Sequence, residues 1–417
     1  MVEKKHNPKA VIVGGSIAGI SCALTLIKAG WEVQVLDKSP SPPTGCSTGA
    51  GLILDPLSQK LIQSWISRPE LLLESTLPLT TEQNRAIDGE IKVGRILTDD
   101  ENFNYRAAHW ADLHSLLYKE LPSHIFLWGH RFLSLTISDD KTSVKVKAKV
   151  TKTDEMVEIV GDLLVAADGC LSSIRETFLP NLKLRYSGYY CWRGVFDFSK
   201  KENREIVMKM KKKAYPEIGK CLYMDLALGT HILLFEIPKN KINWVWFVNE
   251  AEPQFKARSM TMKVNGDMVK RLHKQVDDLW VPELTEVIKE TKDPFINVIY
   301  DCDPLEQIVW DNVVLVGEAA HPTTPHCARS TNMTLLDASI LGQCLRRNRR
   351  LFNLESALAE YQALRLPILH AQVLHSRLVG QIKQGLTLSD REPFDPSVAT
   401  TTRYLQKLQI RNIPFHV

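Results

Sequence analysis

Residues 10–19 read Ala10-Val-Ile-Val-Gly-Gly-Ser-Ile-Ala-Gly19, and residues 31–37 read Trp31-Glu-Val-Gln-Val-Leu-Asp37. Between them apolar residues recur at helical spacing, and Gly30 stands where a helix would end. This order predicts a buried strand, a tight turn, a helix and a second strand. A βαβ unit with a glycine-rich turn and an acidic residue after its second strand is typical of dinucleotide binding. The stretch therefore predicts an α/β fold built around a Rossmann-like unit.

Each small residue of the glycine-rich turn has an expected role. Gly14 permits the tight turn, and Gly19 lets the helix pack closely on the strand. Ser16 replaces the middle glycine of the motif, so its side chain must point away from a bound pyrophosphate. Asp37 can accept hydrogen bonds from a ribose hydroxyl. The alternative is a βαβ unit that binds no ligand.

Two later stretches repeat the order of strand, turn and helix. Residues 162–175 contain an apolar run, then Asp168-Gly169, then a helix start. Residues 313–338 contain an apolar run, Gly317-Glu318, a polar loop with two prolines, and a helical pattern after Asn332. The N-terminus of that last helix suits an anion or a polarised carbonyl group. Each stretch taken alone is also compatible with an ordinary structural turn.

The glycine-rich βαβ unit, the Asp-Gly turn and the Gly-Glu loop, in this order, resemble the single-component FAD-dependent aromatic hydroxylases, which are p-hydroxybenzoate hydroxylase-like monooxygenases. The resemblance runs from about Lys9 to Gly380. Trp192-Arg193-Gly194 and His321-Pro-Thr-Thr-Pro325 look most similar to hydroxylases of dihydroxypyridine and hydroxynicotinate. The resemblance implies non-covalently bound FAD, NAD(P)H as a transient co-substrate, and O2 as a reactant.

The same resemblance implies most of a cofactor site. Gly14–Gly19 would face the pyrophosphate, and Asp168-Gly169 would serve both FAD and the incoming nicotinamide. Glu318 matches the family's acid near the ribityl chain, Pro325 would lie beside the isoalloxazine, and residues 330–333 would present N–H groups to its N1 and O2 edge. The expected cofactor-binding residues are Gly14, Ser16, Ile17, Ala18, Gly19, Asp37, Lys38, Ala50, Arg106, Asp168, Gly169, Glu318, Pro325, Ser330, Thr331 and Asn332.

Three departures from the family pattern limit this transfer. Glu318 stands where relatives carry Asp, so its carboxylate reaches about one methylene further. Cys327-Ala-Arg-Ser-Thr331 replaces a glycine-rich run, so side chains crowd a loop where glycine lets backbone and flavin come close. Trp110 stands where relatives usually place an FAD-contacting arginine, and either Arg106 substitutes for it or the contact is absent.

His326 and Arg329 are the candidate catalytic residues, because both lie in the loop that leads to the helix near Asn332. Reduced flavin carries negative charge at N1 and O2, and a guanidinium nearby would add to the field of the helix N-terminus. The alternative for Arg329 is a side chain that points to solvent or pairs with a surface acid.

Residues 186–249 are rich in β-branched and aromatic residues, which predicts antiparallel strands. One face of such a sheet can cover a flat aromatic substrate above the flavin, although aromatic residues in strands more often belong to a core. The candidate substrate-binding residues are Tyr189, Arg193, Tyr223, His231 and Trp246.

The 417 residues are enough for two or three domains. We expect a Rossmann-like FAD-binding domain over 1–75, 105–182 and 298–345. An antiparallel-sheet substrate domain would take 76–104 and 183–297, and a C-terminal helical region would take 346–417. Within that region, residues 356–384 predict a long helix with a kink or restart at Pro367.

The composition excludes several classes of protein. A net charge of +4 is weak evidence for a nucleic acid partner, and no run of 18 apolar residues predicts a membrane segment. The eight cysteines show no Cys-x-x-Cys pair, which suits reduced thiols in the cytoplasm. His321, His326 and Cys327 match no zinc-site spacing, so no metal is expected. A monomer or homodimer is expected.

The sequence predicts an FAD-dependent monooxygenase that uses NAD(P)H and O2 to hydroxylate or otherwise oxygenate an electron-rich aromatic or heteroaromatic small molecule. A second glycine-rich βαβ unit is missing from the sequence, which argues against a reductase with two bound dinucleotides. One alternative is a flavoprotein that oxidises or rearranges a specialised metabolite without oxygen insertion. The other is a non-catalytic FAD-binding protein.

Overall fold

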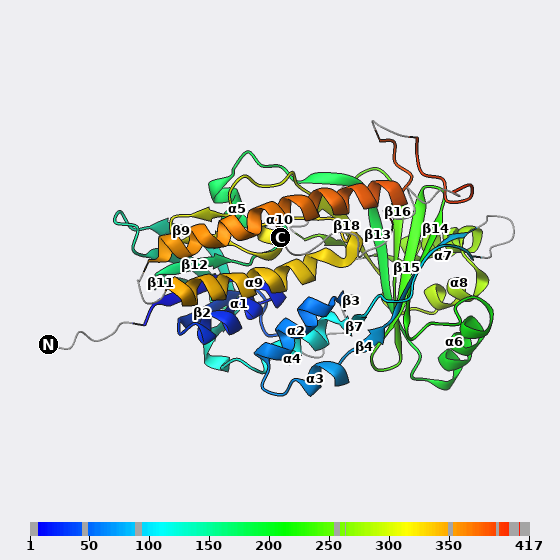
Figure 1. Cartoon of the computed structure of the whole chain (residues 1–417), viewed down its shortest axis with the longest axis horizontal. Coiled ribbons are helices and arrows are strands. Elements are labelled where there is room, and N and C mark those ends of the chain that lie inside the picture. Colours follow the sequence, from blue (N-terminus) through cyan, green and yellow to red (C-terminus); the bar gives the residue numbers. More distant parts are fainter. Residues whose placement is uncertain are drawn as a thin grey trace.

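The computed structural model describes residues 7–43, 49–87, 94–253, 259–262, 264–348, 353–388, 392–399 and 408. A mostly parallel sheet with its helices forms one half of the molecule, and a large, mostly antiparallel sheet forms the other (Figure 1). Two long C-terminal helices pack on the first half, and the longer of them extends to the large sheet. The predicted fold class, a Rossmann-like unit with an antiparallel sheet and C-terminal helices, is confirmed.

The parallel sheet brings the three sequence motifs together. Its strand order is β19-β20-β12-β1-β2-β8. The members are β1 (Lys9–Val13), β2 (Glu32–Asp37), β8 (Phe126–Trp128), β12 (Leu163–Ala166), β19 (Val309–Trp310) and β20 (Val313–Leu315). The strands that precede the three motifs, β1, β12 and β20, are adjacent and parallel, so their turns meet at one edge of the sheet. Ala10, Val11 and Ile12 are fully buried, because helices or strands cover both faces.

Smaller elements surround this sheet. The helices are α1 (Ile17–Lys28), α2 (Pro56–Trp65), α3 (Glu70–Glu74), α4 (Trp110–Tyr118) and α5 (Ser173–Phe178), with the 3-10 turn η1 (Ser123–Ile125). The strands β3 (Gly51–Leu54), β7 (Tyr105–His109) and β4 (Leu77–Leu79) form one small sheet. The strands β9 (His130–Ile137), β10 (Val144–Val150) and β11 (Met156–Gly161) form another.

The large sheet has the order β17-β18-β13-β16-β15-β14-β5-β6. Its strands are β5 (Thr81–Ile87), β6 (Gly94–Asp100), β13 (Arg185–Asp197), β14 (Cys221–Ala227), β15 (Thr230–Ile237), β16 (Lys241–Asn249), β17 (Thr261–Met262) and β18 (Phe295–Asp301). One face packs against α6 (Lys201–Lys213), α7 (Gly266–Leu279) and α8 (Pro282–Lys289) around Trp244, Trp246 and Trp280. The other face points toward the parallel-sheet half.

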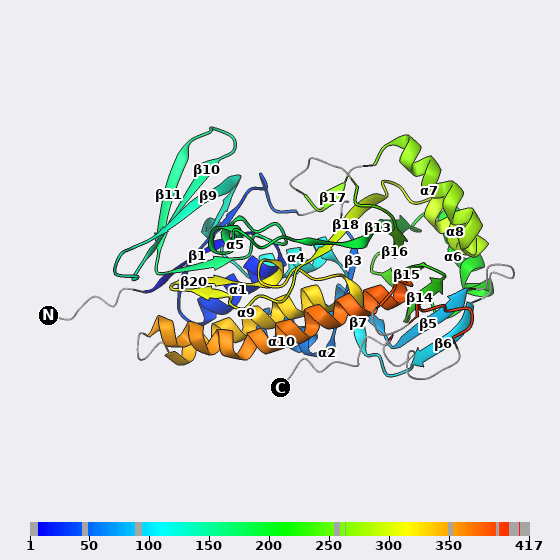
Figure 2. The same cartoon turned by 90° about the horizontal axis from the view of Figure 1, so that it is seen from above.

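The helices α9 (Arg329–Asn348) and α10 (Leu354–Lys383) lie side by side in both views (Figures 1 and 2). The 30 residues of α10 form one helix that contains Pro367, so of the kink or restart expected at this proline the restart is absent. At 1.5 Å per residue α10 is about 45 Å long, and it reaches from the parallel sheet to the large sheet. Among the described residues, none of the helices is long and apolar enough to span a membrane.

Candidate functional site

A cavity of about 1270 Å³ lies between the two halves of the molecule. The N-terminus of α1, the turns after β12 and β20, the start of α9 and one face of the large sheet all contribute to its walls. Pockets for single small ligands usually have volumes of about 300–1,000 Å³. The cavity is therefore large enough for a long cofactor together with a second small molecule.

The first end of the cavity is built by the glycine-rich turn. Ser16, Ile17 and Ala18 line it, and the Ser16 side chain makes no capping hydrogen bond to α1. The backbone N–H groups of the first turn are thus available to an anion, as a pyrophosphate requires. Gly14 has φ +111°, and a Cβ there would lie 2.2 Å from the carbonyl oxygen of Ala167. Only glycine allows this turn.

Asp37 hydrogen-bonds to backbone N–H groups in the glycine-rich turn and just after its own strand. Its carboxylate accepts a hydrogen bond from the N–H of Gly15 at 2.7 Å and another from the N–H of Ser39 at 2.7 Å. The ring of Trp128 packs against Gly15, and neither Asp37 nor Lys38 is among the cavity-lining residues. In the structure Asp37 therefore braces the glycine-rich turn, and its ribose contact stays a prediction.

The Asp-Gly turn does present a free acceptor. One oxygen of Asp168 accepts a hydrogen bond from the N–H of Ile174 at 3.3 Å. The other, Oδ1, is buried and has no partner among the described residues. Burial raises the pKa of Asp168 above its ordinary value. Because Gly169 lines the cavity and a buried acceptor usually finds a donor, this turn fits a hydroxyl group of a ribityl chain.

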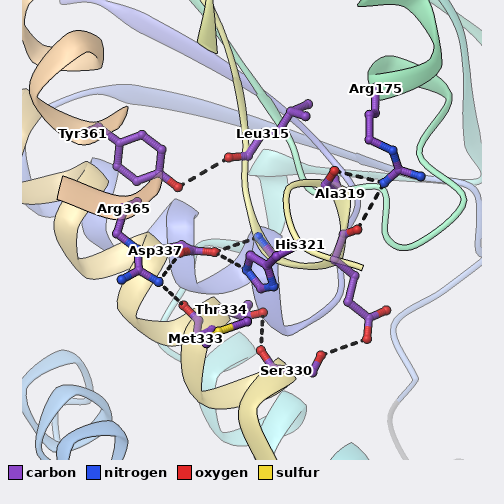
Figure 3. Close-up of polar contacts among 12 residues, drawn as sticks. Arg175, Leu315, Ala319, His321, Ser330, Met333, Thr334, Asp337, Tyr361 and Arg365 are labelled. Atoms are coloured by element: carbon purple, nitrogen blue, oxygen red, sulfur yellow. Dashed lines mark hydrogen bonds and ion pairs between the residues drawn. The ribbon is translucent and has the colours of Figure 1, made fainter. Parts of the chain in front are cut away.

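Hydrogen bonds join the Gly317-Glu318 turn to Arg175 of α5 and to Ser330 near the start of α9 (Figure 3). Arg175 donates from Nη1 to the carbonyl oxygens of Glu318 and Ala319 at 3.2 and 3.0 Å. The carboxylate of Glu318 accepts a hydrogen bond from the hydroxyl of Ser330 at 2.8 Å, and both residues line the cavity. The longer side chain of Glu318 thus reaches the start of α9.

Arg106 makes its hydrogen bonds away from the cavity. Arg106 donates to the hydroxyl and carbonyl oxygens of Thr76 and to the carbonyl oxygen of Leu73. It holds the end of α3 against β7 and does not line the cavity, whereas Trp110 does. Of the two possibilities raised by the sequence, the geometry favours the loss of the family's arginine contact.

The loop before α9 has a strained backbone. It contains the 3-10 turns η2 (Gly317–Ala319) and η3 (His326–Ala328). Cys327 and Ala328 have φ values of +65° and +52°, in the left-handed region that favours glycine. Asn332 holds this conformation, because its amide donates to the carbonyl oxygens of Ala328 at 2.6 Å and Ile53 at 3.1 Å. Ala50, Pro325, Ser330 and Thr331 line the cavity, whereas Asn332 braces it from behind.

Arg329 is the first residue of α9 and is only 1% exposed. It lines the cavity, and its positive charge acts on Asp55 and Tyr105, lowering the pKa that burial alone would give each of them. The structure therefore places the guanidinium inside the molecule, at a helix N-terminus that is already electropositive. The alternative of a solvent-facing Arg329 is wrong.

The large sheet separates the candidate substrate residues into two groups. Arg193 and His231 line the cavity, and Tyr189 lies behind them with its hydroxyl 3.4 Å from Nδ1 of His326. Tyr223 and Trp246 point to the opposite face, where the Trp246 indole donates to Thr230 and the Tyr223 hydroxyl accepts from Glu217. Successive residues of a strand face opposite sides, and the sequence alone did not tell which side faces the cavity.

A buried triad of His321, Asp337 and Arg365 joins the turn after β20 to the two C-terminal helices, α9 and α10 (Figure 3). Arg365 of α10 donates to Asp337 of α9 at 2.8 Å, and His321 lies 2.7 Å from the same carboxylate. The N–H of Gly317 completes the site at 2.9 Å. Burial alone would raise the pKa of Asp337, but these partners hold it below its ordinary value. Sequence analysis did not single out Asp337.

Comparisons with known proteins agree with this geometry. Residues 9–117 match the family described as FAD dependent oxidoreductase. The 6-hydroxynicotinate 3-monooxygenase of Pseudomonas fluorescens is 24% identical over 366 residues, covering 86% of this chain and 88% of that protein. The 3-hydroxybenzoate 6-hydroxylase of Polaromonas naphthalenivorans is 26% identical over 393 residues, covering 92% and 90%. The solved 2,6-dihydroxypyridine-3-hydroxylase from Arthrobacter nicotinovorans superposes with a TM-score of 0.74 at 20% identity, covering 92% and 94%.

Fold and site together define an FAD-dependent oxidoreductase. Within that class, the resemblance to the aromatic hydroxylases is confirmed, because the two curated relatives named above, a monooxygenase of 6-hydroxynicotinate and a hydroxylase of 3-hydroxybenzoate, align over most of this chain.

Proposed function

We propose that the protein is an FAD-dependent monooxygenase that uses NAD(P)H and O2 to hydroxylate or otherwise oxygenate an electron-rich aromatic or heteroaromatic small molecule. One observation carries the proposal: a single cavity connects the glycine-rich turn of α1 to a chamber with apolar walls and two histidines under the large sheet. A dinucleotide cofactor and a flat substrate can thus meet inside one cavity. The names of the similar proteins support the same chemistry.

The residues have distinct tasks in this proposal. FAD, when bound, would supply the redox and oxygen chemistry. The N–H groups at the start of α1 would hold its pyrophosphate, and Asp168 and Glu318 would orient its ribityl chain. The start of α9 and Arg329 would stabilise negative charge at the flavin edge. His231 and His326 would orient the substrate, while the apolar strand residues exclude water.

The decisive experiment measures NAD(P)H consumption by the FAD-loaded protein across a panel of phenols, hydroxypyridines and indoles, with product masses determined under 18O2. We expect one class of compound to accelerate NAD(P)H oxidation and to gain one labelled oxygen. Oxidation without label would favour a flavoprotein that removes electrons only, a possibility that the crowded loop at Cys327 and Ala328 keeps open. A protein that binds no FAD would overturn the proposal.

Arg329 offers a first test at the level of a single residue. Replacing it with alanine removes a buried positive charge beside the proposed flavin edge. Arg329→Ala should therefore lower the flavin's reduction potential and slow hydride transfer, and Arg329→Lys should restore much of both. Spectroelectrochemistry of the two variants measures the effect, and an unchanged potential in Arg329→Ala would exclude this role.

The cellular compartment and the oligomeric state of the protein are also proposals. The seven cysteines of the described residues are buried free thiols, which suits a reducing compartment such as the cytoplasm. We propose a monomer or homodimer that needs no nucleic acid or membrane partner. Size-exclusion chromatography with light scattering tests the oligomeric state.

A further inference from the structure

The chamber under the large sheet contains a buried lysine. Lys383 is the last residue of α10, is 3% exposed and lines the cavity. Its Nζ lies 3.1 Å from Oδ1 of Asn84 and 2.7 Å from the sulfur of Met224. The surrounding cavity walls are apolar and come from β14, β15 and β16: Leu222, Leu233, Phe235, Val245 and Phe247. A charged ammonium group is costly in such surroundings unless a partner compensates it.

The compensation inside the protein is indirect. Glu82 is fully buried on β5, and its charge favours the charged form of Lys383. Asn84 lies between the two groups, because its amide donates to Glu82 at 3.3 Å while its oxygen accepts from Lys383. The contacts to Asn84 and Met224 occupy two of the three N–H bonds of the ammonium group. Lys383 therefore retains capacity to bind a ligand in the cavity.

Two histidines lie beside Lys383, and one of them has a nitrogen atom available for a ligand. The Nδ1 of His231 lies 2.6 Å from the amide oxygen of Gln384, and the rings of His231 and His326 are 5.2 Å apart. The Nε2 of His326 is buried and has no partner among the described residues. Burial lowers the pKa of His326 to about 3 and that of His231 well below its ordinary value. Both rings are therefore neutral near pH 7.

We propose that Lys383 determines substrate specificity by binding an anionic oxygen, either a carboxylate or an ionised ring hydroxyl, on a flat aromatic ring held between the histidines and the apolar strand residues. The proposal deepens the proposed function and rests on it. An anion would occupy the remaining N–H bond of Lys383 and compensate its desolvation, which a neutral ligand cannot do. A lysine is a compact charge without a fixed planar geometry, so it accepts either kind of oxygen.

The test compares anions with neutral analogues of the same shape by isothermal titration calorimetry on the protein as purified. Benzoate against benzamide tests the carboxylate. Ionised 4-cyanophenol against 4-methoxybenzonitrile tests the ring hydroxylate, above the pKa of the free phenol. We expect the native protein to prefer at least one anion over its neutral analogue by about tenfold or more. The pair that shows the preference identifies the oxygen.

Substitutions assign the preference to Lys383. Lys383→Met should weaken binding of the preferred anion by about 10- to 100-fold, the range of a charged hydrogen bond, and leave the neutral analogue nearly unchanged. Lys383→Arg should retain the preference. Lys60→Met is the matched control, because it makes the same change in charge at an exposed position of α2 and should have no effect. The double variant Glu82→Gln/Lys383→Met removes both buried charges and should behave like Lys383→Met, even if the single variant folds poorly.

A pH profile separates recognition from a structural role. The groups that influence Lys383 are Glu82, Cys327, His231 and His326, and burial lowers the pKa of Lys383 itself. Anion affinity should fall at alkaline pH in the native protein and at a higher pH in Lys383→Arg. The proposal is overturned if neither anion is preferred, if neither binds at millimolar concentration, or if Lys383→Met keeps the preference. These outcomes are independent of whether the protein binds FAD, seen as a yellow colour, and oxidises NAD(P)H. Those two observations test the proposed function.

Discussion

The protein buries charge in two places, and the two clusters differ in whether their opposite charges are in direct contact. In the triad of His321, Asp337 and Arg365, the carboxylate accepts from the guanidinium, the imidazole and a backbone N–H. In the chamber cluster of Lys383, His231 and His326, the ammonium group is paired only indirectly, through Asn84. In each cluster one histidine nitrogen has no partner among the described residues, and the same holds for Nη1 of Arg365.

The difference indicates different functions for the two clusters. The triad joins the turn after β20 to α9 and α10, and its oxygen and nitrogen atoms face one another (Figure 3). Such a closed arrangement positions a backbone. The chamber cluster lines a cavity among apolar side chains, where incompletely bonded polar groups are costly unless a ligand binds them. Charge that serves the framework is thus paired directly with the opposite charge, whereas charge that serves a ligand lacks such a direct partner inside the protein.

The largest expected effect comes from removing the guanidinium of Arg365 from the triad. Arg365→Met leaves the fully buried carboxylate of Asp337 without its strongest partner, and breaking a buried ion pair costs about 3–5 kcal/mol. We expect a loss of that size in the free energy of unfolding, measured by urea denaturation. Arg347→Met is the control, because its ion pair with Glu360 is largely exposed and should contribute little. Equal losses in both variants would contradict the comparison.

The second-largest effect is the pH dependence of stability that His326 in the chamber is expected to cause. The pKa of His326 is about 3 in the folded protein, against about 6.5 when unfolded. Below pH 6.5 the unfolded chain binds a proton at this histidine that the folded chain does not bind. The free energy of unfolding therefore decreases as the pH falls from 6.5 toward 3. This amounts to about 2 kcal/mol at pH 5. His326→Gln should reduce the drop in unfolding free energy between pH 7 and pH 5 by that amount, and an unchanged drop would exclude a buried neutral His326.

The smallest loss of stability is expected where the chamber's charges are removed together. Glu82→Gln/Lys383→Met eliminates both buried charges, and such a replacement is often neutral or stabilising by about 1–4 kcal/mol. We expect an unfolding free energy equal to or above that of the native protein, in contrast to Arg365→Met. A loss as large as that of Arg365→Met would mean that the chamber cluster belongs to the framework.

Much of the cofactor end of the site could be predicted from the sequence. Gly14 and Gly19 are required by a turn whose geometry is local, and the apolar run at Ala10–Val13 forms the strand it indicates. The roles of neighbouring residues were harder to predict. Asp37 and Arg106 have the right chemistry for an FAD contact, and in the structure they hydrogen-bond to nearby backbone and hydroxyl groups, so their contacts with FAD stay predictions. A short distance to a competing partner cannot be read from residue types.

The sequence by itself determined the βαβ unit, the order of the three motifs and the antiparallel character of the second half, because these depend on glycine conformation and on the period of apolar residues. Only the tertiary structure decided which face of the large sheet meets the cavity, turning His231 inward and Tyr223 outward. It also brought Lys383 next to Asn84, 299 residues away in the chain. No local pattern distinguishes this lysine from a surface lysine, because its burial follows from the length of α10 and from how that helix packs across both halves of the molecule.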